Sequence, residues 1–186
     1  KLHKGEQYDD AYKAINPRSQ VPVLVDDGQV VTQIAAITLY LDEKFPQAGF
    51  LPKSGVARAK AIELLMWMNN TVHPTFTHVF MPGKYSKNTD VQADIKANAI
   101  ETYRNLMGEL QAAVVAAQQA GRPWLAGEQV GPLDVYALTL LRWGTIAGIN
   151  PDDFAPLWAF VQKVGQHPAV QRAIERERLQ LNCYRG

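Results

Sequence analysis

The segment from Ile15 to Leu41 constrains the fold more than any other part of the sequence. Within it, Asp26-Asp27-Gly28 separates two short runs rich in valine, a pattern typical of a tight turn between two strands. A helix start follows the second run. The segment therefore predicts strand, turn, strand and helix, which is half of a small α/β domain.

The Val21-Pro22 step at the start of the first run has two interpretations. An X-Pro bond is where a cis peptide has a low cost, and a cis bond here would turn the N–H and C=O of Val21 outward. An extended peptide could then pair with Val21 as an added strand. Alternatively, Pro22 only begins an edge strand, because proline donates no ladder hydrogen bond.

Composition and charge exclude several classes of protein. The 186 residues, 47% of them hydrophobic, are enough for one large domain or two small ones. A net charge of +1 without long charge runs argues against a nucleic-acid partner, and the lack of an apolar run of about 18 residues argues against a membrane span. The single cysteine, Cys183, allows no intrachain disulfide and predicts a reducing compartment, the cytoplasm.

Prolines and a glycine between Phe45 and Pro52 predict a linker between two domains, residues 1–46 and 55–186. Beyond the linker, apolar residues recur at spacings of three and four, which is typical of helices. The second domain is accordingly predicted to be all-helical. Its expected helices cover residues 56–80, 91–120, 132 to about 148, 154–165 and 168–178.

The start of the helix at 132 is especially clear. Gly131 is the expected N-cap, and Pro132 suits the first helical position. Asp134 lies near the positive end of the helix dipole, where we expect a structural and not a catalytic role.

Four groups of residues, in order along the chain, resemble motifs of the glutathione transferase family, and in detail its bacterial Beta class. They are Asn16-Pro17 with Gln20–Leu24 and Asp26–Gly28, Gln33–Ile37 with Tyr40-Leu41, Trp124–Gly127 with Leu133–Tyr136, and His167–Ala173. The resemblance extends from about Lys4 to Arg178. It implies an α/β plus all-α fold: an incomplete thioredoxin-like N-terminal domain, which binds glutathione, followed by the family's C-terminal helical bundle.

The same resemblance implies where glutathione would bind. The backbone of Val21, before a cis Pro22, would pair with the cysteinyl part, and the amide of Gln33 would hold the γ-glutamyl end. Ile34 departs from the family, which commonly has a serine there for the γ-glutamyl carboxylate. Backbone N–H groups would still bind the ligand, but we expect weaker binding. Lys4 falls where Beta-class members carry a lysine that approaches glutathione.

In the helical domain the resemblance implies two further site residues. His73 matches a Beta-class histidine that reaches the active site, and we take it as the catalytic candidate. Trp143 lies where a tryptophan borders the pocket for the hydrophobic co-substrate. Plainer interpretations remain: His73-Pro74 ends or kinks a helix, Trp143 is a core residue, and Lys4 is an ordinary surface lysine. The resemblance implies no metal.

The implied activity is attack of the glutathione thiolate on a small hydrophobic electrophile. The family resemblance also implies a two-fold homodimer built from helices near 33–45 and 56–80. The Ser, Cys or Tyr that activates the thiol lies in the family's first strand and helix, which have no counterpart here, and we expect that segment to precede Lys1 in the protein. Two alternatives are a non-catalytic glutathione-transferase-like binding protein, which Ile34 and Gly131 favour mildly, and a stress-response interaction module.

Overall fold

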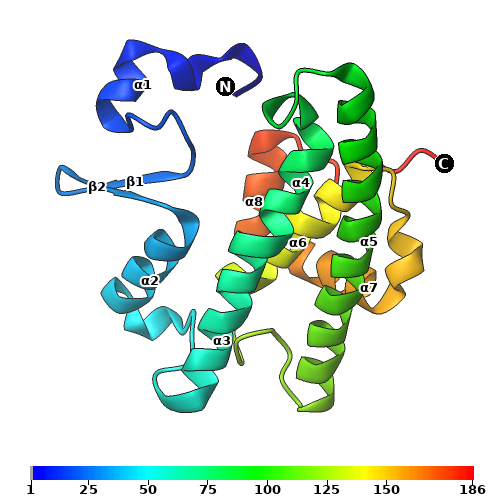
Figure 1. Ribbon diagram of the computed structural model, residues 1–186. Helices are drawn as coiled ribbons and strands as arrows, with labels where there is room; N and C mark the ends of the chain where they lie inside the picture. The colour runs from blue at the N-terminus through cyan, green and yellow to red at the C-terminus, as the bar shows by residue number, and fades with distance from the viewer. Residues whose placement is uncertain (1) are drawn as a thin grey trace. The chain divides into compact units, whose positions relative to one another are not determined.

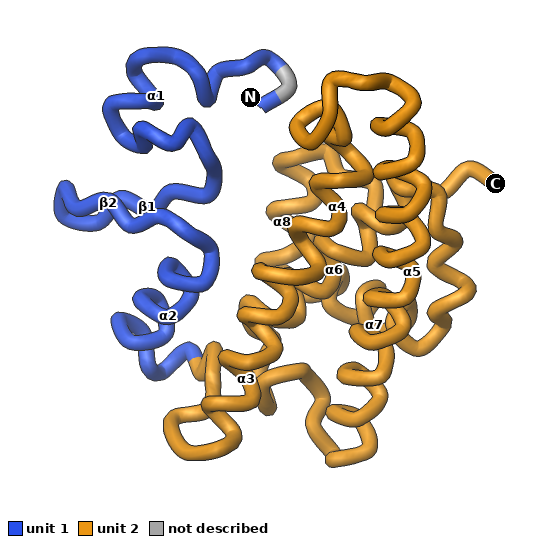
Figure 2. Tube along the Cα trace, in the orientation of Figure 1, with its two compact units in different colours: residues 1–48 blue, residues 49–186 orange. Residues whose placement is uncertain are grey.

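The computed structural model describes residues 2–186, without the side chain of His3. The chain divides after Ala48 into two compact units, residues 1–48 and 49–186, each coloured separately in Figure 2. The division falls inside the segment Phe45–Pro52, where prolines and a glycine predict a linker.

The first unit is built around one β-hairpin (Figure 1). Strands β1 (Val23–Asp26) and β2 (Gln29–Thr32) are antiparallel, as the sequence predicts. Both turn residues between them, Asp27 and Gly28, have positive φ angles of 47° and 76°. Two such residues form the turn whose twist matches that of the strands, and this accounts for the Asp-Gly pair.

Helices flank the hairpin on both sides along the chain. Two 3₁₀ turns, Leu2–Lys4 and Glu6–Tyr8, and the short helix α1 (Asp10–Ile15) precede it, and α2 (Ile34–Lys44) follows it. The helix α2 contacts both strands. The Asp26 carboxylate accepts hydrogen bonds from the Tyr40 hydroxyl and the Lys44 ammonium, which ties α2 to the turn end of the hairpin.

The second unit begins with one long helical stretch. It consists of α3 (Gly55–Trp67), a π turn (Met68–Val72) and α4 (His73–Phe80), without a break between them. Proline inside a regular α-helix clashes with the carbonyl four residues earlier, and the wider π turn just before Pro74 relieves that clash. The helical stretch predicted over 56–80 therefore continues through His73-Pro74, and the interpretation in which this pair ends a helix is wrong. The interpretation in which the pair kinks the helix stays a prediction.

The remaining helices lie close to their predicted bounds. They are α5 (Thr89–Gln119), α6 (Pro132–Ile146), α7 (Ala155–Gly165) and α8 (Pro168–Glu177), with 3₁₀ turns at Pro46–Ala48, Pro82–Lys84 and Pro151–Phe154. Helix α4 packs against α5, and α6 packs against α7 (Figure 1). Fully buried apolar side chains between them form the core: Tyr103, Leu110, Leu133, Leu140 and Leu157. Along residues 2–186, no helix is long and apolar enough to cross a membrane.

Candidate functional site

The register of the hairpin brings four of the predicted site residues to one end. Val23 pairs with Thr32 at the end opposite the Asp27-Gly28 turn. Val21-Pro22 comes just before Val23, and Gln33-Ile34 just after Thr32, so both pairs leave the sheet at its open end. The two motifs therefore leave neighbouring strands at the same end of the hairpin.

The backbone at Val21 is exposed and unpaired. The Val21-Pro22 peptide bond is cis, as one of the two interpretations of this step predicts. Val21 is 51% exposed, and among residues 2–186 its N–H and C=O have no protein partner. An extended ligand can therefore pair with both groups, in the manner of an added strand.

The chain just before Val21 is held firmly. Its neighbour Gln20 has a carbonyl oxygen that accepts hydrogen bonds from Tyr12 Oη and Asn16 Nδ2, both at 2.7 Å. Asn16 is buried, and its Oδ1 accepts a further bond from the N–H of Arg18 at 3.1 Å. The buried amide thus fixes the loop that presents Val21, which gives the Asn-Pro motif a physical role.

Gln33 has an unusual backbone conformation. As the N-cap of α2 it has φ 72° and ψ 121°, in the region of positive φ that side-chain-bearing residues rarely adopt. The first helical hydrogen bond of α2 runs from Ile37 N to Gln33 O at 2.9 Å, and the Gln33 side chain caps no backbone N–H. The first N–H groups of the helix, beginning at Ile34, therefore receive no cap from Gln33, and N–H groups at a helix start attract a carboxylate.

Lys4 lies apart from these features in sequence and in secondary structure. It is an exposed residue at the end of the 3₁₀ turn Leu2–Lys4. Its role toward glutathione stays a prediction.

In the second unit the structure brings His73 and Trp143 into contact. Their ring centroids lie 4.7 Å apart at an interplanar angle of 80°, an edge-to-face arrangement. Phe76, one turn after His73 on α4, stacks on Trp143 at 4.8 Å and 12°. Phe80 continues the row with a centroid distance of 5.7 Å from Phe76. The result is an aromatic row, defined here as His73, Trp143, Phe76 and Phe80.

Tyr136 is a partner of His73 that the sequence did not predict. Its hydroxyl oxygen lies 2.8 Å from Nδ1 of His73. Tyr136 and Trp143 are seven residues apart on α6, hence on one face of that helix, and this spacing was the available signal. The missing information was that α4 packs against this face.

Burial shapes the acid–base properties of this pair. It lowers the pKa of His73 below its usual value, so the imidazole is neutral at neutral pH. It also raises the pKa of Tyr136 far above that of an exposed tyrosine, so the phenol keeps its proton. The site thus holds a neutral imidazole against a neutral phenol.

Asp134 is structural, as expected. It is 0% exposed, and its two carboxylate oxygens accept hydrogen bonds from the N–H groups of Leu125 at 2.8 Å and Gly131 at 2.7 Å. These bonds join the loop before α6 to the first turn of the helix. Burial raises the pKa of Asp134, and the two backbone donors offset part of that rise.

The part of the chain that the structure describes contains no group of three or more histidine, cysteine, aspartate or glutamate side chains arranged to hold a metal ion. The polar groups at the open end of the hairpin are instead backbone amides and one side-chain amide. Such groups suit a peptide-like or carboxylate ligand.

Comparison with known proteins agrees with this geometry. The family described as glutathione S-transferase, N-terminal domain, matches residues 1–44. Glutathione S-transferase GstA of Escherichia coli O157:H7 is 30% identical over 180 residues, which cover 96% of this chain and 84% of that protein. The chain belongs to the glutathione S-transferase family.

Solved structures of the family share its fold. A sphingomonad glutathione S-transferase complexed with glutathione is 27% identical, with a TM-score of 0.78 over 93% of this chain and 81% of that chain. The bacterial beta class enzyme of Sphingomonas chungbukensis is 26% identical, with a TM-score of 0.77 over 92% of this chain and 80% of that one. The predicted fold class, a thioredoxin-like unit followed by a helical bundle, is confirmed, and so is the resemblance to the Beta class.

Proposed function

We propose that this protein binds glutathione at the open end of the hairpin and transfers it to small hydrophobic electrophiles. The observation that carries the proposal is the unpaired backbone of Val21 beside the open N-terminus of α2. Family relatives support the ligand, because the sphingomonad transferase is complexed with glutathione.

Two of the three residues of glutathione, the cysteinyl and the γ-glutamyl, would have matching groups in the first unit. Its cysteinyl amide and carbonyl would pair with the C=O and N–H of Val21, next to Pro22. Its γ-glutamyl carboxylate would accept from the first N–H groups of α2, beginning at Ile34, with the Gln33 amide bound to the same end. Lys4 would approach a carboxylate or the sulfur.

The second unit would contribute the chemistry toward the co-substrate. His73 is the proposed catalytic residue, and Trp143 the proposed wall of the electrophile site. The aromatic row places apolar rings beside His73, with Phe80 exposed at its end, and such rings suit an aromatic electrophile. In the reaction the glutathione sulfur forms a bond to an electrophilic carbon, and the leaving group departs with the electrons of the broken bond. A thiolate is required, because it is far more nucleophilic than the thiol.

Glutathione binding is tested by calorimetric titration of the full chain with glutathione. Substituting Gln33→Ala should weaken binding by about five- to tenfold, the worth of one or two hydrogen bonds. Gln29→Ala is the matched control, because Gln29 is an exposed glutamine on the same hairpin beside the turn. Absence of binding to the unmodified chain, or equal losses in both variants, would overturn the proposal.

Turnover separates the enzyme from a binding protein. A chlorodinitrobenzene co-substrate would release chloride and form a coloured thioether, which is followed by absorbance. Ile34 favours the second candidate, a non-catalytic glutathione-binding or stress-response interaction protein, because its side chain offers no hydroxyl to the γ-glutamyl end. Binding without product above the uncatalysed rate would support that candidate.

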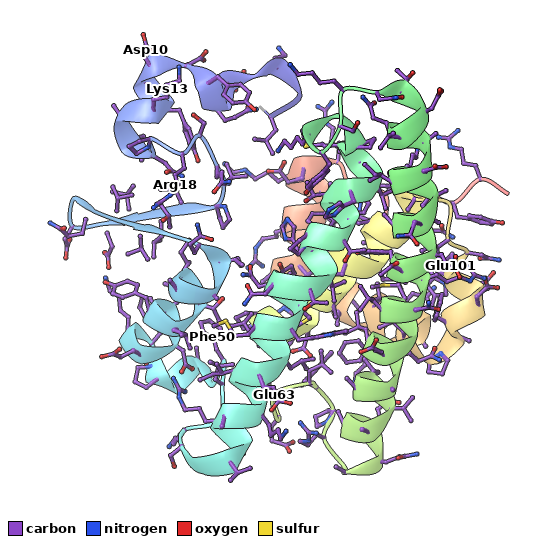
Figure 3. All side chains as sticks on the ribbon, in the orientation of Figure 1. Asp10, Lys13, Arg18, Phe50, Glu63 and Glu101 are labelled. Carbon is purple, nitrogen blue, oxygen red and sulfur yellow. The ribbon has the colours of Figure 1, made fainter. Side chains whose placement is uncertain are left out.

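We also propose a two-fold homodimer in a reducing, cytoplasmic setting. Helices α3 and α5 carry a groove of about 290 Å³ lined by Glu63, Leu64, Trp67, Glu109 and Ala113; Figure 3 labels Glu63 on α3. Helix α3 falls within 56–80, one of the two helical segments, with 33–45, that we propose to form the dimer, and the apolar side chains of the groove would pack against the second copy. Light scattering should give twice the 20.7 kDa mass of the chain, and a monomer mass would contradict the dimer.

A further inference from the structure

The contact between His73 and Tyr136 joins two helices across 63 positions of the sequence. His73 begins α4, Tyr136 lies in the first half of α6, and both belong to the second unit. The 2.8 Å between Nδ1 and the hydroxyl oxygen is a good hydrogen-bond length. Either atom can donate in principle, since a neutral imidazole carries its proton on Nδ1 or on Nε2.

The surroundings of Tyr136 decide the direction of this bond. The phenol has one O–H, and among residues 2–186 no group other than His73 Nδ1 accepts from it. Tyr136 is only 9% exposed, so water is a poor substitute. If Nδ1 carried the proton, the phenol O–H would be left unpaired, at a cost of about 1–3 kcal/mol. Tyr136 therefore donates to Nδ1, and the imidazole proton is on Nε2.

The aromatic neighbours fix the orientation of the ring. Trp143 packs edge-to-face against His73, and Phe76 stacks on Trp143 and so holds the indole ring in place. Nε2 of His73 has no hydrogen-bond partner among the described residues. It is also not among the fully buried, unpaired side-chain nitrogen and oxygen atoms of those residues. The N–H of Nε2 is thus the one polar group of His73 left for a ligand.

We propose that Tyr136 is a positioning residue, which holds His73 as the Nε2–H tautomer so that it donates a hydrogen bond to an anionic group of glutathione. The ligand part of this inference rests on the proposed function. The assignment of the His73 tautomer depends only on contacts within the protein. The anionic group is a carboxylate or the thiolate, and both are acceptors for the same donor.

The experiment is ¹⁵N NMR of the full chain labelled at histidine, with His73→Gln to assign the His73 signals among those of the chain's 4 histidines. In the unmodified protein Nε2 should carry the proton, and Nδ1 should have the shift of an unprotonated nitrogen that accepts a hydrogen bond. In Tyr136→Phe the Nδ1 signal should move downfield. The pKa of His73 should also rise in this variant, because the lost O–H donor favoured the neutral ring.

Tyr103→Phe is the matched control. It also removes a buried phenol hydroxyl, one that donates to the Leu140 carbonyl at 2.7 Å, but not one that contacts His73. It should leave the Nδ1 shift and the His73 pKa unchanged. A proton on Nδ1 in the unmodified protein would overturn the tautomer assignment, and this measurement needs neither variant. Equal shifts in the two variants would overturn the role of Tyr136.

Binding completes the test. Tyr136→Phe should weaken the binding of glutathione about fivefold, which corresponds to one hydrogen bond. Tyr103→Phe should weaken it much less. If S-methylglutathione shows the same fivefold loss, the acceptor is a carboxylate; if the loss disappears, it is the thiolate. Equal affinity of the unmodified and Tyr136→Phe proteins for glutathione would overturn the positioning role. A chain that shows the Nε2–H tautomer but binds no glutathione would refute the proposed function and leave the tautomer standing.

Discussion

Val23 lies opposite Thr32 in the hairpin, and this single pair sets the geometry of the candidate site. Because a strand pair has a fixed register, the residues before Val23 and after Thr32 must leave the sheet together. A shift of one residue would turn the side chains of one strand to the other face and separate Val21 from Gln33. The valine-rich strands and the Asp27-Gly28 turn set this register, and the register in turn keeps Val21 and Gln33 at the same end of the hairpin.

The positive φ of Gln33 leads to the first prediction. Glycine adopts φ 72° without the steric cost that a side chain incurs, whereas alanine keeps that cost. We expect Gln33→Gly to be more stable than Gln33→Ala by about 1 kcal/mol, measured by urea denaturation. Both variants should lose affinity for glutathione equally, since both lack the amide.

This pair of variants separates strain from function. Glycine is also a better N-cap than alanine, so capping and the relief of strain both favour Gln33→Gly over Gln33→Ala in stability. If Gln33→Ala were as stable as Gln33→Gly, the conformation of Gln33 would not be strained. If Gln33→Gly retained full affinity, its side chain would not be part of the glutathione site.

The sequence predicts well those features that local signals specify. The hairpin follows from Asp-Asp-Gly between valines, and the start of α6 from Gly131-Pro132 with Asp134. Such signals act within a few residues, where turn geometry and helix capping have few alternatives. The long helix α5 is equally clear, because its apolar face repeats over many turns.

Other features depend on packing and escaped prediction. The short helix α1 and the 3₁₀ turns before it were not predicted, because six residues or fewer give too little periodicity. The π turn before Pro74 and the contact between His73 and Tyr136 depend on how α4 meets α6. Neither helix carries that information alone.

The second prediction concerns Asp134, which bonds two backbone N–H groups from within the core. An asparagine has one acceptor oxygen, so Asp134→Asn leaves one buried donor facing an NH₂ group. We expect a loss of about 2 kcal/mol in the free energy of unfolding, measured in urea. Asp94→Asn is the control, because Asp94 is exposed on α5, and its effect should stay within about 0.5 kcal/mol. Equal small effects would contradict the structural role of Asp134.

The third prediction concerns Gly131, the N-cap of α6. A Cβ built at this residue would lie 3.1 Å from the carbonyl oxygen of Phe50, closer than most side-chain contacts. Alanine is also a poor N-cap compared with glycine. We expect Gly131→Ala to lower the free energy of unfolding by about 1 kcal/mol. A Cβ at Gly127 would meet no atom within 4 Å, so Gly127→Ala is the matched control and should cost less.

The last prediction is the pH dependence that His73 gives to stability. Burial lowers its pKa in the folded chain below the usual 6.5, which the unfolded chain retains. At pH values between the pKa of His73 in the folded chain and its pKa in the unfolded chain, the unfolded chain binds more protons. The free energy of unfolding therefore increases with pH through this window. The contribution is fully present above about pH 6.5 and is lost as the pH falls through the folded pKa of His73.

Since glutamine does not titrate, the free energy of unfolding of His73→Gln should change less with pH than that of the unmodified protein between about pH 5 and 7. Parallel profiles for His73→Gln and the unmodified protein would mean that the His73 imidazole is no harder to protonate in the folded chain than in the unfolded one.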